Sequence, residues 1–104
     1  MTDIKNIIHQ QLHDNKIVLY MKGSLKFPMC GFSAKALKIL SLCGIKDFLV
    51  VNVLEDNDIR QGIKEYSNWP TVPQLYINAE FIGGSDIMTE MYESGELQEL
   101  LKTI

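Results

Sequence analysis

Two short, continuous apolar runs constrain the fold of this chain more than any other feature. Residues 16–21 (KIVLYM) and 48–53 (FLVVNV) are rich in β-branched side chains and lack the alternation of a strand with one wet face. Both are therefore predicted to be strands covered on both faces. The segment between them, residues 31–43, reads as a helix with one thin polar stripe, so it is expected to be largely buried and to end at Gly44. A strand, a helix and a second strand in this order predict a parallel pair with a right-handed crossover.

The other elements extend this pattern to α-β-α-β-α-β-β-α-α. The predicted helices are residues 3–13, 31–43, 58–67, 86–94 and 96–103, and the predicted strands are 16–21, 48–53, 73–77 and 81–83. Residues 23–29 are predicted to be a loop, and the last two strands an antiparallel hairpin. We therefore expect an α/β, thioredoxin-like fold, with a mixed four-stranded sheet and helices on both faces. A chain of 104 residues leaves room for one domain, assigned to residues 1–104.

Charge and composition argue against several classes of partner. The formal net charge is −3 and the lysines and arginines are scattered along the sequence, so no nucleic acid is expected to bind. No apolar run approaches the roughly 20 residues of a membrane span. The first residues, Met1 to Lys5, resemble neither a signal peptide nor a transit peptide, so we expect a cytoplasmic protein.

The chain has two cysteines, Cys30 and Cys43. Separated by the helix predicted for residues 31–43, their sulfurs would lie roughly 18–20 Å apart, too far for a disulfide. Cys30 precedes that helix, where unpaired N–H groups and the helix dipole lower the pKa of a thiol, and Lys22 is expected to add to the effect. Cys43 is interpreted as a packing residue. A dithiol oxidoreductase needs a second cysteine three positions after the first, and this chain has Ser33 there.

Four motifs carry a resemblance to a known family. The sequence Cys30-Gly31-Phe32-Ser33 resembles the CGFS signature of monothiol glutaredoxins, and residues 58–60 (DIR), 67–75 (SNWPTVPQL) and 83–87 (GGSDI) match the same family in order and spacing. The similarity runs from about residue 4 to residue 101. Two positions depart from the family pattern. Ser85 stands where a cysteine is frequent, and Ala79 stands where a glycine is frequent, so the hairpin is expected to use a different turn.

The resemblance implies a [2Fe–2S] cluster as cofactor, together with glutathione. Two chains would each supply the Cys30 thiolate and two glutathiones would supply the other two, which gives a homodimer bridged by the cluster. It also implies a BolA-like protein and apo iron–sulfur recipient proteins as partners. The residues implied for glutathione are Lys22 and Arg60 at the glycine carboxylate, Val72 before a cis proline, and Ser85 and Asp86 at the γ-glutamyl end.

Three functions remain open at this point. The chain is expected to be an iron–sulfur carrier rather than a turnover enzyme. The leading alternative is a glutathione-dependent thiol–disulfide oxidoreductase that removes glutathione from protein thiols, a route that needs only Cys30 and glutathione. The third is an interaction module that keeps the fold without the metal.

Overall fold

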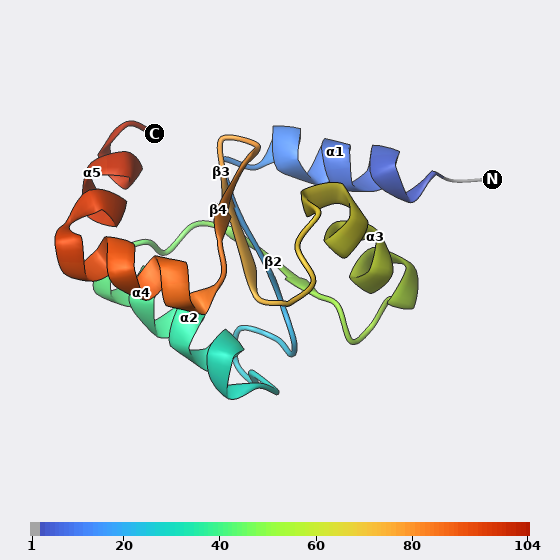
Figure 1. Cartoon of the computed structure of the whole chain (residues 1–104), viewed down its shortest axis with the longest axis horizontal. Coiled ribbons are helices and arrows are strands. Elements are labelled where there is room, and N and C mark those ends of the chain that lie inside the picture. Colours follow the sequence, from blue (N-terminus) through green and yellow to red (C-terminus); the bar gives the residue numbers. More distant parts are fainter. Residues whose placement is uncertain (1–2) are drawn as a thin grey trace.

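The computed structural model describes residues 3–104. Met1 and Thr2 lie outside that range, and part of the expectation about the first residues of the chain concerns them. Helices and strands follow the predicted order (Figure 1). The helices are α1 (Ile4–Asp14), α2 (Gly31–Leu42), α3 (Asn57–Ser67), α4 (Ser85–Ser94) and α5 (Glu96–Lys102), and the strands are β1 (Ile17–Met21), β2 (Leu49–Asn52), β3 (Gln74–Ile77) and β4 (Glu80–Gly83). None of the helices in this range is long and apolar enough to cross a membrane.

The four strands form one mixed sheet in the order β2-β1-β3-β4. β1 pairs with β2 in parallel, as the crossover predicted, and β3 pairs antiparallel with both β1 and β4. The predicted α/β, thioredoxin-like arrangement is confirmed.

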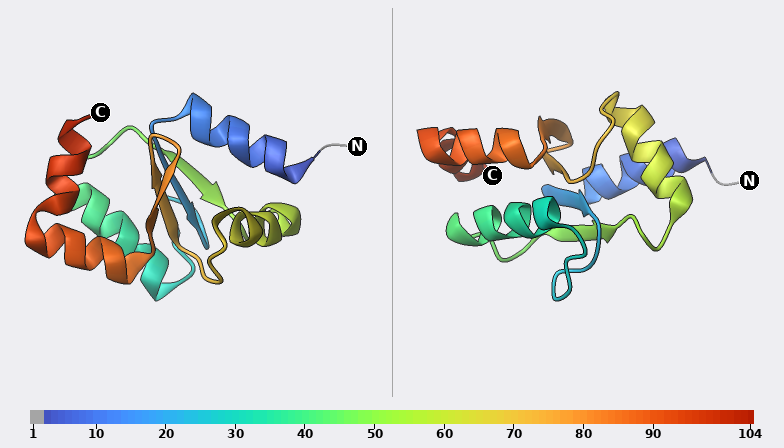
Figure 2. Two further views of the ribbon diagram at one scale, coloured as in Figure 1. Left: turned by 45° about the horizontal axis from the view of Figure 1, so that its top comes forward. Right: turned by 60° about the horizontal axis from the view of Figure 1, so that its bottom comes forward.

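β1 shows why its sequence is apolar throughout. All five of its residues are buried, and successive side chains point to opposite faces of the sheet. Leu19 and Met21 pack with α2, α4 and α5, whereas Val18 and Tyr20 pack with α1 and α3. Figures 1 and 2 show the sheet standing between these two groups of helices. A central strand with a helical layer on each side has no solvent face on which a polar residue would be useful.

Short-range features of the sequence also account for where the helices begin and end. The Asp3 side chain accepts a hydrogen bond from the Lys5 N–H at the start of α1, and Asp56 does the same for the N–H groups of Asp58 and Ile59 at the start of α3. α2 ends at Leu42 with Cys43 as its C-cap, and Gly44 follows with φ of +78°.

The β3–β4 turn corrects one prediction. Ala79 was expected to divert the hairpin to another turn, but Asn78 and Ala79 both have positive φ, 52° and 65°. Two left-handed residues are what a two-residue type I′ hairpin requires. The half-buried Ala79 packs against the layer that contains Tyr76. The expectation was wrong because sheet pairing and packing impose the turn even where the residue has a Cβ.

The topology brings three connections to one end of the sheet. β3 runs antiparallel to β1 and to β4, so the segment that enters β3 lies beside the segments that leave β1 and β4. The segment that enters β3 contains the Val72–Pro73 pair, the one that leaves β1 contains Lys22, and the one that leaves β4 contains Gly84. Helices α2 and α4 begin nearby, so their positive ends face the same space.

Candidate functional site

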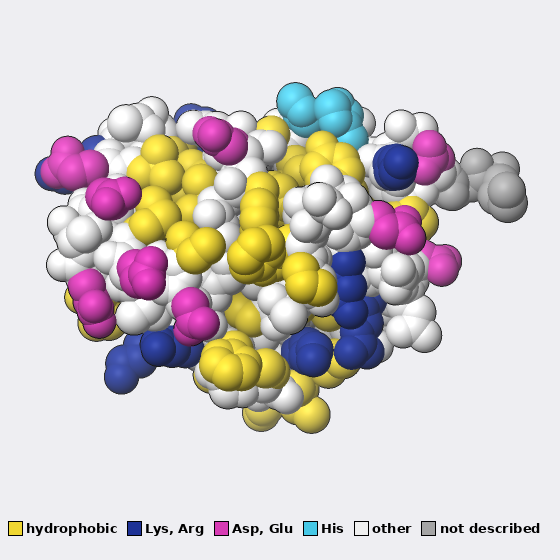
Figure 3. Space-filling view, viewed as in Figure 1, with side chains coloured by type: hydrophobic (Ala, Val, Ile, Leu, Met, Phe, Trp, Pro, Cys, Tyr) yellow, Lys and Arg dark blue, Asp and Glu magenta, His cyan; other side chains and the backbone are white. Residues whose placement is uncertain are grey.

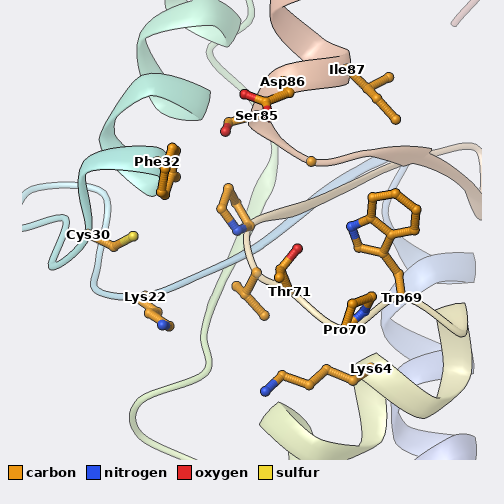
Figure 4. Close-up of a pocket in the computed structure, with 13 residues that line it drawn as sticks. Lys22, Cys30, Phe32, Lys64, Trp69, Pro70, Thr71, Ser85, Asp86 and Ile87 are labelled. Atoms are coloured by element: carbon orange, nitrogen blue, oxygen red, sulfur yellow. The ribbon is translucent and has the colours of Figure 1, made fainter.

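A cavity of about 510 Å³ lies where these connections meet (Figure 4). Its size falls within the range of small-ligand pockets, about 300–1,000 Å³. Five of the six residues predicted for the site line it, namely Cys30, Lys22, Val72, Ser85 and Asp86. The other lining residues are Phe32, Lys64, Trp69, Pro70, Thr71, Pro73, Gly84 and Ile87.

Cys30 is the N-cap residue of α2, with an extended backbone (φ −153°, ψ 136°), and its sulfur points into the cavity (Figure 4). The sulfur makes no capping hydrogen bond by geometric criteria, but it faces the free N–H groups of the first helical turn. The backbone N–H of Ser33 is the largest cause that lowers the pKa of Cys30, and it outweighs the opposing effect of burial. The Phe32 N–H, the Ser33 hydroxyl and the Lys22 charge lower this pKa further. The predicted direction is confirmed, with the helix terminus contributing more than Lys22.

Ser33 has a structural role beyond the missing second thiol. Its side chain is completely buried, and Oγ accepts a hydrogen bond of 3.1 Å from the Lys22 backbone N–H. This bond joins the end of β1 to the first turn of α2. It therefore keeps Lys22 and Cys30 on the same wall of the cavity.

The opposite wall is the segment from Trp69 to Pro73, in which the Val72–Pro73 bond is cis, as the resemblance implied. Val72 is buried, and in residues 3–104 its backbone N–H and C=O form no turn or loop hydrogen bond. They are therefore available to an extended peptide ligand.

Gln74 holds this segment in place and was missed by sequence reasoning. It is completely buried, and its Nε2 donates hydrogen bonds to the carbonyls of Trp69 (3.2 Å) and Thr71 (3.0 Å). Its Oε1 accepts one from the hydroxyl of the buried Tyr76 (3.1 Å). The available signal was a polar amide at the start of an otherwise apolar strand, since a buried polar group needs hydrogen-bond partners.

The third wall is the start of α4. Gly84 is the N-cap and provides no side-chain cap, so the N–H groups of the first turn face the cavity without one. Asp86 lies inside the first turn and is not the N-cap. Its exposed carboxylate can therefore contact a ligand rather than close the helix.

The positive charges of the cavity come from Lys22 and Lys64. Lys64 extends from α3 into the space below Thr71 (Figure 4), and sequence reasoning did not select it. Arg60, which it did select, is half-buried one helical turn earlier and is not among the lining residues. Lys64 has the same spacing from Arg60 that neighbours on one helix face have, but no motif distinguished it. The cavity thus has cations at one end and Asp86 at the other.

Cys43 lies at the opposite end of α2 and packs beside the buried layer that contains Leu40. Burial raises the pKa of this thiol, in contrast to Cys30. Within residues 3–104, no three Cys, His, Asp or Glu side chains gather in a way that could hold a metal ion.

Comparison with known proteins agrees with the fold. The family model described as Glutaredoxin matches residues 17–82. The chain is 54% identical to an uncharacterized monothiol glutaredoxin, ycf64, of Porphyra purpurea, over 98% of this chain and 94% of that protein. It is 52% identical to glutaredoxin 4 of Escherichia coli K12, over 91% of this chain and 82% of that protein. Among solved structures, reduced apo GrxS14 of poplar superimposes with a TM-score of 0.83 at 48% identity, covering 96% of this chain and 91% of that one.

A thioredoxin-like fold with one reactive thiol at a helix start beside a cis proline defines the class. The chain belongs to the glutaredoxin family, and the CGFS sequence with its high identity to monothiol members makes it a monothiol glutaredoxin.

Proposed function

We propose that this glutaredoxin binds a [2Fe–2S] cluster between two protomers, with Cys30 and glutathione as ligands, and transfers it to apo iron–sulfur proteins. The observation that carries the proposal is a single thiol of lowered pKa that opens into a cavity with opposite charges at its two ends. A cytoplasmic location, and a BolA-like protein that replaces one protomer, belong to the same proposal.

The donor set of the chain fits a shared cluster. Thiolates are the usual ligands of [2Fe–2S] clusters, and four are needed. Each protomer offers Cys30 alone, because Cys43 lies at the far end of α2 and residues 3–104 contain no other group of metal-binding side chains near the cavity. Two protomers therefore supply two ligands, and two external thiols must supply the rest.

Glutathione fits as the source of those thiols because its charges match those of the cavity. Its glycine carboxylate would lie near Lys22 and Lys64, with Arg60 as a further candidate at longer range. Its cysteine would pair with the free backbone groups of Val72, as in strand addition. Its γ-glutamyl carboxylate would lie at the N–H groups of Ser85 and Asp86, and its ammonium at the Asp86 carboxylate. In this arrangement the glutathione thiol comes close to the Cys30 sulfur.

The lowered pKa of Cys30 favours a second function, removal of glutathione from protein thiols. The Cys30 thiolate would attack the glutathione sulfur of a mixed disulfide and release the protein as a thiolate. A second glutathione thiolate would then attack the Cys30–glutathione disulfide, giving oxidised glutathione and free Cys30. This route needs no second cysteine, so Ser33 in that position does not exclude it.

Reconstitution with and without glutathione tests the proposal. Wild-type protein, iron and sulfide should give a coloured dimer in size-exclusion chromatography only when glutathione is present, and removal of the iron should return a monomer. Cys30→Ser should form no coloured species while keeping its circular dichroism spectrum, because a hydroxyl is a poor iron ligand and this position caps a helix outside the core. Cys43→Ser is the matched control and should behave as wild type.

A stable coloured dimer formed without glutathione or any other added thiol would disprove the shared-ligand arrangement. A coloured Cys30→Ser protein would disprove the ligand assignment.

A further inference from the structure

Four large apolar side chains beside Cys30 are exposed to solvent. Leu25 is 60% exposed, Phe27 73%, Met29 68% and Phe32 62%, and together they are called the loop surface below. They are the four most exposed of the eight large hydrophobic side chains that reach solvent in the part of the chain that the structure describes. Apolar groups gathered in one exposed place mark a binding surface more often than scattered ones do.

The backbone of this loop is well ordered by its own hydrogen bonds. The Met29 N–H donates to the Lys22 carbonyl (2.9 Å), and the Ser24 N–H donates to the Phe27 carbonyl (3.1 Å). The Phe27 N–H donates in turn to Ser24 Oγ (3.1 Å), and Asn52 Oδ1 accepts from the Gly23 N–H (2.9 Å), which ties the loop to the end of β2.

Gly23 makes this closed loop possible. Its φ is +100°, and a Cβ at this position would overlap the Phe27 carbonyl oxygen and the Met29 nitrogen. The two arms of the loop therefore approach each other only because residue 23 has no side chain. A loop held in this way presents its apolar side chains at little further cost in conformational entropy when a partner binds.

The segment of the chain that carries the loop surface has charges of one sign. Residues 16–46 contain six lysines and no aspartate or glutamate, in a chain whose net charge is −3. Lys26 lies within the loop, and Lys35 follows Phe32 by one helical turn on α2; both are exposed. Figure 3 shows apolar side chains at the lower edge of the molecule between two groups of basic ones, and acidic side chains along the left side and at the upper right of the same face.

From these observations we propose that the loop surface docks the protein to which the cluster passes, and that this partner presents an apolar cleft bordered by carboxylates. The inference rests on the proposed function, because it places the acceptor directly beside the Cys30 sulfur. Within the cluster-bridged dimer, direct contact between two loop surfaces would oppose lysine to lysine, so these surfaces are expected to stay free for the acceptor.

The test measures transfer of the cluster from the glutathione-bound dimer to an acidic apo plant-type ferredoxin, followed by visible circular dichroism. Phe27→Ser should lower the second-order rate constant about tenfold, since truncation of a central aromatic anchor typically costs that much. Lys26→Glu should lower it as well and weaken its dependence on salt. Loss of the cluster to EDTA should be unchanged in both variants, which separates docking from stability of the cluster.

Leu42→Ser is the matched control, because Leu42 is 57% exposed at the other end of α2. It should transfer the cluster at the wild-type rate.

Transfer at the wild-type rate by Phe27→Ser would overturn the inference. A Phe27→Ser protein that forms less dimer, but whose remaining dimer transfers the cluster at the wild-type rate, would also overturn the inference, since the loop surface would then pair with a second copy of the chain. If Phe27→Ser does not fold, the transfer rate is measured for Met29→Gln and Lys26→Glu instead. Wild-type rates in both variants would overturn the inference. A wild-type protein that takes up no cluster would instead refute the proposed function itself.

Discussion

Replacement of Gln74 by methionine should lower the stability of the protein and loosen one wall of the cavity. Methionine has a similar length but can neither donate to the carbonyls of Trp69 and Thr71 nor accept from Tyr76. The two carbonyls belong to exposed residues and can turn to water, at about 0.5–1 kcal/mol each. The Tyr76 hydroxyl is buried and loses its partner, at about 1–3 kcal/mol. We expect the free energy of unfolding to fall by about 3 kcal/mol in total.

A double-mutant cycle makes this reasoning specific to the hydrogen bond. Tyr76→Phe alone should cost about 1–2 kcal/mol, because Gln74 Oε1 is left buried without a donor. The double variant should be at least about 1 kcal/mol more stable than the sum of the two single effects predicts, because no buried partner is stranded. Urea unfolding followed by circular dichroism measures all three variants.

The same variant should affect the ligand. Calorimetry with glutathione should show weaker binding to Gln74→Met than to Tyr76→Phe, since only the former releases the segment that carries Val72. Strictly additive unfolding energies, together with unchanged binding of glutathione, would refute the positioning role assigned to Gln74.

Three further predictions concern the thiols and the cations. Iodoacetamide should modify Cys30 with a lower pH midpoint than Cys43, because a lowered pKa leaves more thiolate at a given pH and a raised pKa leaves less. Peptide mass spectrometry across a pH series measures both midpoints, and the reverse order would contradict the site described. Ser33→Ala should shift the Cys30 midpoint upward, because the Ser33 hydroxyl helps to lower the pKa of this thiol. The variant should also cost about 1–2 kcal/mol of stability, because the Lys22 N–H loses its acceptor. An unshifted midpoint would exclude the hydroxyl as a cause of the lowered pKa. Lys64→Gln should weaken glutathione binding in calorimetry more than Arg60→Gln does, because only Lys64 lines the cavity, and the opposite ranking would restore the assignment made from the sequence.

Much of the fold was predictable because it follows from short stretches of chain. The apolar runs around Leu19 and Val51 had to be strands with two covered faces, and Gly44 had to follow a helix. The hairpin turn at Ala79 was not predictable in this way. Its positive φ follows from the pairing of β3 with β4, and a local preference for glycine did not decide it.

The sequence by itself determined the order of elements, the single thiol at a helix start and the membership of the glutaredoxin family, since motifs and periodicity are properties of neighbouring residues. Only the tertiary structure decided which side chains share the cavity. Lys64 lines it, whereas Arg60, one helical turn earlier on α3, is not among its lining residues. Gln74 holds the cavity wall through its hydrogen bonds to the carbonyls of Trp69 and Thr71, and the loop surface lies beside Cys30. Both follow because strands distant in sequence end together at one edge of the sheet. Contacts of this kind depend on packing between segments, which no local pattern encodes.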